Sequence, residues 1–432
     1  MKKRILCLFC AVVIMTVLPA CASKSGSADE IPAEIPAKTG LEDTASEKTD
    51  AGNPQADEEK TGTDFHIGIV TGSFSQSEDD RRGAEAFQKK YGNDMVTLAI
   101  YPDNFTEELD TTIRIIEELA DDPDMKAIIV NQAVDGTTEA FRRIHEKRPD
   151  ILCIAGEAYE DFADIGAQAD LVVNYDFISR GYLMIHTAHE LGCDTFVHIS
   201  FPRHLSYESV ARQVAVMKAA CEEFDINFAM EEAPDPTTDV GVPGAQAYIS
   251  EHVPGWADKY GQKAAYFCTN DAHTEPLIRS LLECGGYFIE ADLPSPLMGY
   301  PGALDLDLTS YAGDFETITS KVEEAVVAKG GAGRFGTWTY SYGYTVSAGL
   351  AEHAKNVIEG NSTLNNMNDL AKAYGVFSPG VDWNGSGYTD AQTEKMSDNI
   401  FLIYQDTYIF GDPGHYMGTT KITVPESYLT MK

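Results

Sequence analysis

The stretch AAYFCTNDAHTEPLIRSLLECG, which spans Ala264–Gly285, decides the fold of this chain. Its apolar first part, Ala264–Cys268, stops at the polar triplet Thr269-Asn270-Asp271. Apolar residues at helical spacing follow, and Gly285 ends them. This pattern predicts a strand–turn–helix unit whose polar residues lie at the carboxyl end of the strand. Ligands of open α/β sheets bind just outside such ends, so we expect Asn270 and Asp271 to face a ligand crevice.

The same alternation of strands and helices continues on both sides of this unit. Short apolar strands are expected at 66–71, 95–101, 126–130, 151–155, 171–173, 195–199, 227–231, near 296–298 and at 337–340. Helices are expected at 78–91, 107–119, 137–145, 178–191, 206–224, 244–259, 315–328 and 345–359. Such alternation indicates a parallel sheet with helices on both faces. One sheet of this type rarely holds so many units, so we predict an α/β chain with two doubly wound parallel-sheet lobes.

Composition and charge limit the classes of partner. The chain has 432 residues, enough for two or three domains, and its aromatic content of 10% is typical of a folded protein. Its formal net charge of −36 argues against DNA, RNA or anionic lipid as a partner, because these polyanions would be repelled. The net charge says little about a small ligand, which is surrounded only by its own pocket.

The first residues form a targeting signal. Lys2, Lys3 and Arg4 precede an apolar segment at 5–18, which is too short to favour a membrane span. Leu18–Cys21 then resembles a bacterial lipobox, which implies a signal peptide at 1–20 and diacylation of Cys21. An ordinary secretory peptide cleaved nearby is the alternative. Residues 21–63 are predicted to be a disordered tether, because from Ser23 onward they contain no aromatic residue and cannot bury a core.

Three segments together resemble the type I periplasmic binding proteins, the ribose- and galactose-binding group. They are Thr269-Asn270-Asp271 with its helix and Gly285-Gly286, the segment from Tyr175-Asp176 to Leu191-Gly192, and Thr337–Gly360. The resemblance covers about 64–360 and implies two lobes joined by a hinge. It assigns 64–177 plus 335–360 to the first lobe and 178–334 plus 361–432 to the second. The implied crossovers lie near Asp176, at 332–337 and near Asn361.

The chain departs from this group at two positions. Gly299-Tyr300-Pro301 stands where many members have Gly-Phe-Asp, and Tyr340 or Ser341 stands where the return strand usually ends in Gln. These departures argue against a simple hexose pocket. The chain more closely resembles an uncharacterised bacterial lipoprotein family within the superfamily, which implies a fold but no ligand.

The resemblance implies a cleft between the lobes, lined by the carboxyl ends of strands. The first lobe is expected to contribute Ser73, Phe74, Gln76, Asn131, Gln132, Glu157, Asn174 and Asp176. The second lobe is expected to contribute Arg203, His204, Tyr207, Asn270, Asp271, His273 and Tyr300, with Tyr340 and Tyr342 where the chain returns. Carboxylates and amides bind hydroxyl groups and aromatic faces cover C–H surfaces, which favours a polar, uncharged or weakly charged ligand. Asn and Asp at strand ends are equally typical of helix caps.

The leading hypothesis is a lipid-anchored solute-binding protein on the extracytoplasmic face of a bacterial cell membrane. It would capture a small sugar- or nucleoside-like ligand and deliver it to an ABC importer permease, acting as a monomer without cofactor or metal. The alternative is a sensor that presents its closed form to a membrane receptor kinase. A hydrolase would depend on Glu157, Asp176 or Asp271. However, the sequence contains no G-x-S-x-G elbow, no H-E-x-x-H motif and, after Cys21, no C-x-x-C pair, so we expect no enzyme.

Overall fold

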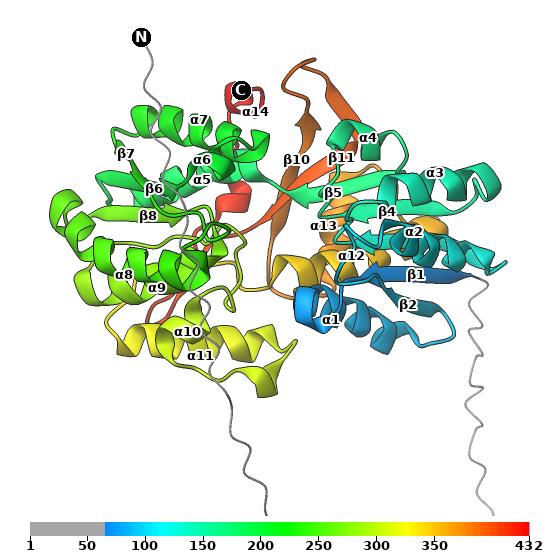
Figure 1. Ribbon diagram of the computed structural model, residues 1–432, viewed down its shortest axis with the longest axis horizontal. Coiled ribbons are helices and arrows are strands. Elements are labelled where there is room, and N and C mark those ends of the chain that lie inside the picture. Colours follow the sequence, from blue (N-terminus) through cyan, green and yellow to red (C-terminus); the bar gives the residue numbers. More distant parts are fainter. Residues whose placement is uncertain (1–64, 432) are drawn as a thin grey trace, which may run out of the picture. The chain divides into compact units, whose positions relative to one another are not determined.

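The computed structural model describes residues 65–431, apart from the side chains of Ser75 and Gln76. These residues belong to one compact unit, which contains two α/β lobes (Figure 1). The two lobes, each with a mainly parallel sheet covered by helices on both faces, confirm the predicted α/β fold class. The predicted signal peptide, Cys21 and the tether lie outside the described residues. None of the helices within 65–431 combines the length and hydrophobicity needed to cross a bilayer.

The first lobe is built on a seven-stranded sheet of order β10-β11-β5-β4-β3-β1-β2. Its strands are β1 (His66–Thr71), β2 (Val96–Ile100), β3 (Met125–Asn131), β4 (Leu152–Gly156), β5 (Leu171–Tyr175), β10 (Trp383–Thr389) and β11 (Met396–Gln405). Neighbouring strands run parallel except β10, which is antiparallel to β11. The central strands are fully or almost fully buried, which explains their continuous apolar runs.

Helices cover both faces of this sheet (Figure 1). They are α1 (Phe74–Tyr91), α12 (Tyr342–Ile358) and α13 (Met367–Gly375) on one face, and α2 (Leu109–Glu118), α3 (Thr137–Lys147) and α4 (Phe162–Gly166) on the other. Gly83 permits the close packing of α1 on α12, because a Cβ atom there would lie 2.1 Å from the carbonyl oxygen of Tyr344. This packing holds the start of α1 beside the start of α12, at the carboxyl ends of the strands.

The second lobe is built on a parallel three-stranded sheet of order β7-β6-β8. Its strands are β6 (Thr195–Ser200), β7 (Asn227–Glu232) and β8 (Ala264–Cys268). Helices α5 (Phe177–Glu190) and α7 (Glu208–Glu223) pack together on one face, and α8 (Gly241–Tyr260) and α9 (Asp271–Cys284) pack together on the other. The lobe also contains α6 (Pro202–Leu205), α10 (Tyr300–Leu304) and α11 (Phe315–Ala328). The predicted strand–turn–helix unit at 264–285 is therefore β8 followed by α9.

The C-terminal region corrects two predictions. Residues 361–432 were expected in the second lobe, but β10 and β11 join the first-lobe sheet through pairing of β11 with β5. The buried apolar run Ile400–Tyr404 covers what would otherwise be an open edge of β5. The chain therefore crosses to the second lobe between β11 and β12 (Tyr408–Ile409), and not near Asn361.

Two predicted strands are also wrong. Residues 296–298 form no strand, and the segment expected to be a strand at 337–340 contains only the last residue of β9 (Gly336–Thr337). Strand β9 belongs to a small antiparallel sheet with β12 and β13 (His415–Tyr416). Proline residues at 294, 296 and 301 disfavour regular strand pairing around the first of these segments, which instead forms an irregular loop. The chain ends in a short helix, α14 (Glu426–Leu429).

A buried ion pair lies where the three crossing segments meet. The guanidinium of Arg180, at the start of the second lobe, donates to the carboxylate of Glu290 at 3.1 Å, and both side chains are at most 3% exposed. Trp338 from the second crossing segment donates its indole N–H to Glu290 at 3.2 Å, and the hydroxyl of Thr407 from the third donates to the same oxygen. The carboxylate of Glu290 therefore links segments that are far apart in the sequence.

Candidate ligand-binding site

A cavity of about 600 Å³ lies between the two lobes. It is lined by Ser77, Glu78, Asp79, Asp80, Phe105, Gln132, Glu157, Tyr159, Asp271, Leu293, Pro294, Ser295, Leu297, Met298, Ser341, Tyr342 and Gly343. The first-lobe residues follow strands β1, β2, β3 and β4, and Asp271 follows β8. The cavity therefore occupies the position at which open α/β sheets bind ligands.

The first acidic group of the cavity comes from a kink in α1. Ser77 has non-helical backbone angles (φ −146°, ψ 57°), so the regular part of the helix starts with Glu78, Asp79 and Asp80. Asp80 is 4% exposed, and one of its carboxylate oxygens accepts a hydrogen bond of 2.7 Å from the side-chain amide of Asn131. Burial, together with the neighbouring charge of Asp79, raises the pKa of Asp80 to about 7.

Glu157 is the second buried carboxylate of the cavity. It follows β4, is 5% exposed and has a left-handed backbone conformation with φ of 50°. Among the described residues, no donor hydrogen-bonds or pairs with its side chain. Burial and the carboxylates of Asp80 and Asp271 raise its pKa well above the ordinary value.

The second lobe contributes carboxylates from the opposite side. Asp271 is the first residue of α9 and its side chain is exposed at the cavity, where desolvation raises its pKa above the ordinary value. Asp292 directly precedes the lining segment 293–298. Burial raises the pKa of Asp292 to about 7, although the guanidinium of Arg180 acts to lower it. No Lys, Arg or His side chain is among the described residues that line the cavity, so the ionisable side chains of its lining are acidic residues and tyrosines.

The rest of the lining is aromatic and apolar. Phe105, Tyr159 and Tyr342 present rings, and Leu293, Leu297 and Met298 present aliphatic side chains. Small hydroxyl groups from Ser77, Ser295 and Ser341 complete the wall. A ligand that fits would combine an apolar or planar body with groups that interact favourably with carboxylates.

Three predicted site residues lie in this cavity with the returning residue Tyr342: Gln132, Glu157 and Asp271. Asn131 is fully buried next to the cavity lining. Its side-chain amide donates hydrogen bonds to Asp80 and to the hydroxyl oxygen of Ser347. These placements fit the expected cleft, and their role in binding stays a prediction.

Other predicted residues do not line the cavity, because their side chains have local partners. The side chains of Asp176 and Asn270 cap the N-termini of α5 and α9. Helix capping is the alternative to ligand binding for Asn and Asp at the ends of strands. Tyr300 is buried in the second-lobe core and donates to the carbonyl of Gly336, and His273 is buried against the carbonyl of Pro234. Further local contacts are those of Ser73 with Asp103, Phe74 with Arg82, Asn174 with Ala158, Arg203 with Asp235, His204 with Thr269, Tyr207 with Arg203, and the ring of Tyr340 with that of Phe315. The side chain of Gln76 lies outside the described residues.

Sequence reasoning missed the main acidic group of the first lobe. Glu78, Asp79 and Asp80 are the first residues of the helix expected at 78–91, and in the structure they directly follow the kink at Ser77. The available signal was this row of three acidic residues at the start of the helix that follows β1. Tyr159 and the segment 293–298 were also missed, since neither belongs to a regular strand or helix.

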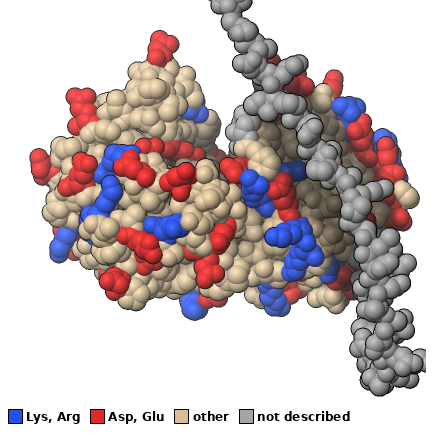
Figure 2. Space-filling model, turned by 90° about the horizontal axis from the view of Figure 1, so that it is seen from below, with Lys and Arg blue, Asp and Glu red and all other residues tan. Residues whose placement is uncertain are grey.

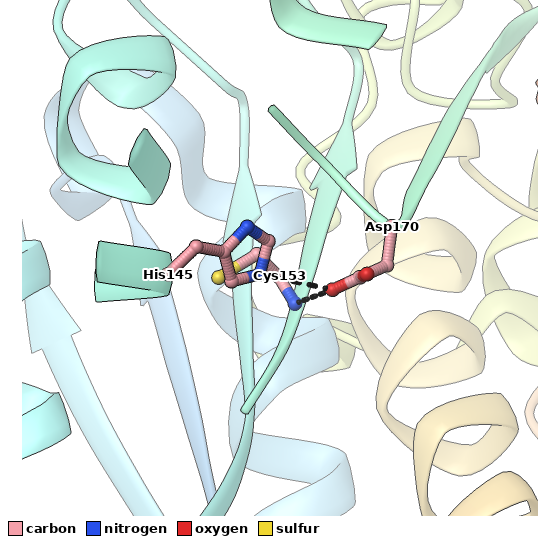
Figure 3. A group of neighbouring side chains, drawn as sticks. All are labelled: His145, Cys153 and Asp170. Atoms are coloured by element: carbon pink, nitrogen blue, oxygen red, sulfur yellow. Dashed lines mark hydrogen bonds and ion pairs between the residues drawn. The ribbon is translucent and has the colours of Figure 1, made fainter. Parts of the chain in front are cut away.

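A second cluster offers metal-binding residue types at the other end of the first-lobe sheet. His145, Cys153 and Asp170 lie close together (Figure 3). One carboxylate oxygen of Asp170 accepts from the backbone N–H of Cys153 at 2.8 Å and lies 3.2 Å from Nε2 of His145. Burial raises the pKa of the Cys153 thiol, which disfavours the thiolate that a metal would need. We interpret the cluster as a link between β4 and the start of β5.

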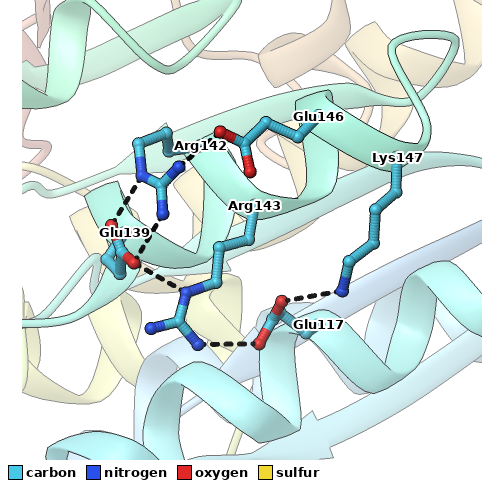
Figure 4. Close-up of polar contacts among 6 residues, drawn as sticks. All are labelled: Glu117, Glu139, Arg142, Arg143, Glu146 and Lys147. Atoms are coloured by element: carbon cyan, nitrogen blue, oxygen red, sulfur yellow. Dashed lines mark hydrogen bonds and ion pairs between the residues drawn. The ribbon is translucent and has the colours of Figure 1, made fainter.

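A larger hollow of about 860 Å³ lies beside α2 and α3. Two of its lining residues, Glu139 and Arg143, belong to a network with Glu117, Arg142, Glu146 and Lys147 (Figure 4). Each cation in the network pairs with a carboxylate, and most of these side chains are about 40% exposed or more. Acidic side chains are spread across the face seen in Figure 2, with basic ones among them. The interlobe cavity differs from this hollow because no Lys, Arg or His is among its described lining residues, whereas Arg143 lines the hollow.

Comparison with known proteins places the chain in a family. The family described as "Protein of unknown function (DUF3798)" matches residues 65–336. This chain belongs to the DUF3798 family. An uncharacterized protein of Treponema pallidum (strain Nichols) is 40% identical to this DUF3798 protein over 210 residues, which is 49% of this chain and 95% of that one. A second uncharacterized protein of the same organism is 39% identical over 179 residues, 40% of this chain and 81% of that one.

A solved structure with a TM-score above 0.5 shares the fold, and others resemble the chain more distantly. A putative transcriptional regulator from Clostridium difficile 630 has a TM-score of 0.73 at 21% identity, covering 80% of the DUF3798 chain and 99% of its own. LsrB from Clostridium saccharobutylicum in complex with AI-2 has a TM-score of 0.44 at 10% identity, with coverage of 80% and 97%. At these sequence identities, structural similarity is evidence for the fold alone. The function of this DUF3798 protein is therefore inferred from its interlobe cavity.

Proposed function

We propose that this chain is a solute-binding protein that encloses a small ligand between its two lobes. The observation that carries the proposal is the cavity of about 600 Å³, which both lobes line with the carboxyl ends of their strands. The three crossing segments around Glu290 provide a hinge about which the lobes could close. The role requires no chemical step, and it uses the buried polar groups of the cavity for recognition.

The N-terminal sequence supports a location for this function. The lipobox-like segment Leu18–Cys21 favours a lipid anchor on the extracytoplasmic face of a bacterial membrane. In this proposal, residues 21–63 tether the binding unit and an ABC importer permease receives the ligand. These statements rest on the sequence and on the proposed role of the cavity.

Native mass spectrometry of the full chain tests the proposal. The protein is purified gently from a rich-medium culture, and we expect an added small-molecule mass that disappears on unfolding. The variant Leu297→Trp fills the cavity and should lose this mass. The variant Met396→Trp is the matched control, because Met396 lies on β11 with 65% of its surface exposed, and it should retain the mass.

Two results would contradict the proposal. A bound mass retained in Leu297→Trp would place the ligand elsewhere on the molecule. If the chain is empty and its melting temperature does not respond to any small-molecule extract, solute binding is rejected.

A further inference from the structure

We propose that the ligand of the interlobe cavity is a small organic cation, whose protonated amine or guanidinium group binds between Glu157, Asp80 and Asp271. This inference rests on the proposed solute-binding function and names the ligand class. It differs from the sequence-based expectation of an uncharged or weakly charged ligand, because the acidic row of α1 enters the cavity.

Glu157 is the observation that points to a ligand. Its side chain is 5% exposed and lines the cavity, yet no described residue donates a hydrogen bond to it. A buried carboxylate without a donor is costly, so most such groups are paired. Its backbone also has a left-handed conformation, with φ of 50°, which is uncommon for a residue with a Cβ atom. The position is therefore unfavourable unless something else supplies the missing donor.

The protein does not supply the counter-charge itself. The described lining contains four more acidic residues and no basic one. Arg82 pairs with the lining residue Glu78 and with Glu85, and Arg180 binds Glu290 and the carbonyl oxygens of Ala291 and Asp292. Among the described residues, no ion pair involves the other four acidic lining residues, Asp79, Asp80, Glu157 and Asp271. A positively charged ligand would fill this role, and an anionic ligand would be repelled.

The spacing of the acidic groups favours an organic cation over a metal ion. Metal ligands must converge on one point, and among residues 65–431 no three carboxylate, His or Cys ligand atoms of this cavity lie within 4.8 Å of one another. The volume of about 600 Å³ suits an organic molecule far better than a bare ion. Phe105, Tyr159 and Tyr342 add ring faces, which attract ammonium and guanidinium groups.

The test separates small molecules by charge. A yeast-extract medium is passed over a cation exchanger at about pH 8, where amines with an ordinary pKa near that of Lys are retained. The retained and flow-through fractions, with CaCl₂ and MgCl₂ as separate probes, are added to the full chain in mild detergent. The measurement is the melting temperature of the wild type, of Glu157→Gln and of Glu146→Gln. Glu146 is a matched control on α3, with a side chain that is 63% exposed.

We expect the retained fraction to raise the melting temperature of the wild type and of Glu146→Gln by several degrees. In Glu157→Gln this rise should fall by more than half, because ligand stabilisation decreases as the dissociation constant increases. Equal rises in wild type and Glu157→Gln would overturn the inference, as would a rise produced by the divalent metals alone. A rise with the flow-through fraction only would overturn the cationic class but support solute binding. No rise with either fraction would reject the proposed function itself.

Discussion

At the scale of single residues, Glu157 opposes the stability of the empty protein. Its pKa is raised in the folded protein, so the folded state favours the protonated carboxyl. Glu157 therefore does not destabilise the protein below the ordinary pKa of a glutamate, and the protein loses stability as the pH rises through the raised pKa. Glutamine has nearly the same shape but cannot ionise. We therefore expect Glu157→Gln to be more stable than the wild type by about 1–2 kcal/mol at about pH 8 and nearly equal at about pH 4.5, measured by urea unfolding.

Glu146→Gln again provides the comparison, because its carboxylate is exposed and, within residues 65–431, pairs with Arg142 alone. It should change the free energy of unfolding by no more than about 0.5 kcal/mol at either pH. If Glu157→Gln is less stable than the wild type at the higher pH, Glu157 has a donor in the empty protein and the unpaired interpretation is wrong.

At the scale of elements, the Arg180–Glu290 pair holds the three crossing segments together. Both side chains are at most 3% exposed, and Glu290 also accepts from Trp338 and Thr407. Removing one charge of a buried pair leaves the other without compensation, so Glu290→Gln should lower the free energy of unfolding by about 3 kcal/mol. The double variant Arg180→Met with Glu290→Gln should lose less than the sum of the single losses, as a double-mutant cycle in urea would show.

The pair Arg279–Glu275 serves as an exposed control, with side chains that are 39% and 40% exposed. Breaking it should cost less than about 1 kcal/mol. Additive losses for Arg180 and Glu290 would mean that the two side chains are not coupled, and the crossing segments would then need another explanation for their association.

At the scale of the whole molecule, the cavity couples ligand binding to protons. The pKa values of Asp271, Asp80 and Asp292 are raised to about 6, 7 and 7, and those of Asp79 and Glu157 are also raised. The nearby cations that oppose these shifts are Arg82, beside Asp79, and Arg180, beside Asp292. A bound cation favours the ionised carboxylates, so binding should release about one proton near neutral pH, and affinity should be at least about tenfold lower at about pH 5 than at about pH 8. Calorimetry of an organic cation that binds, in phosphate and in Tris, measures the release. Equal binding enthalpies after correction for buffer ionisation would contradict it.

The sequence was sufficient to predict the alternation of strands and helices, because buried parallel strands leave continuous apolar runs such as Ala264–Cys268. It was not sufficient to place β11, since pairing with β5 depends on which sheet has an open edge. The same holds within the site. Glu157 and Asp271 follow recognisable strands, whereas Asp80 enters the cavity only because α1 kinks at Ser77, and a kink leaves no periodic signal.

The addition of β11 to the first sheet also bears on how the chain folds. Strand β5 pairs with a strand more than 200 residues later, after most of the second lobe has been made. Such distant pairings bring a large loop-closure entropy and slow folding. During synthesis, β5 would therefore remain an unpaired edge of the first sheet until β11 has been made. This topology favours completion of the chain before the two lobes finish folding together.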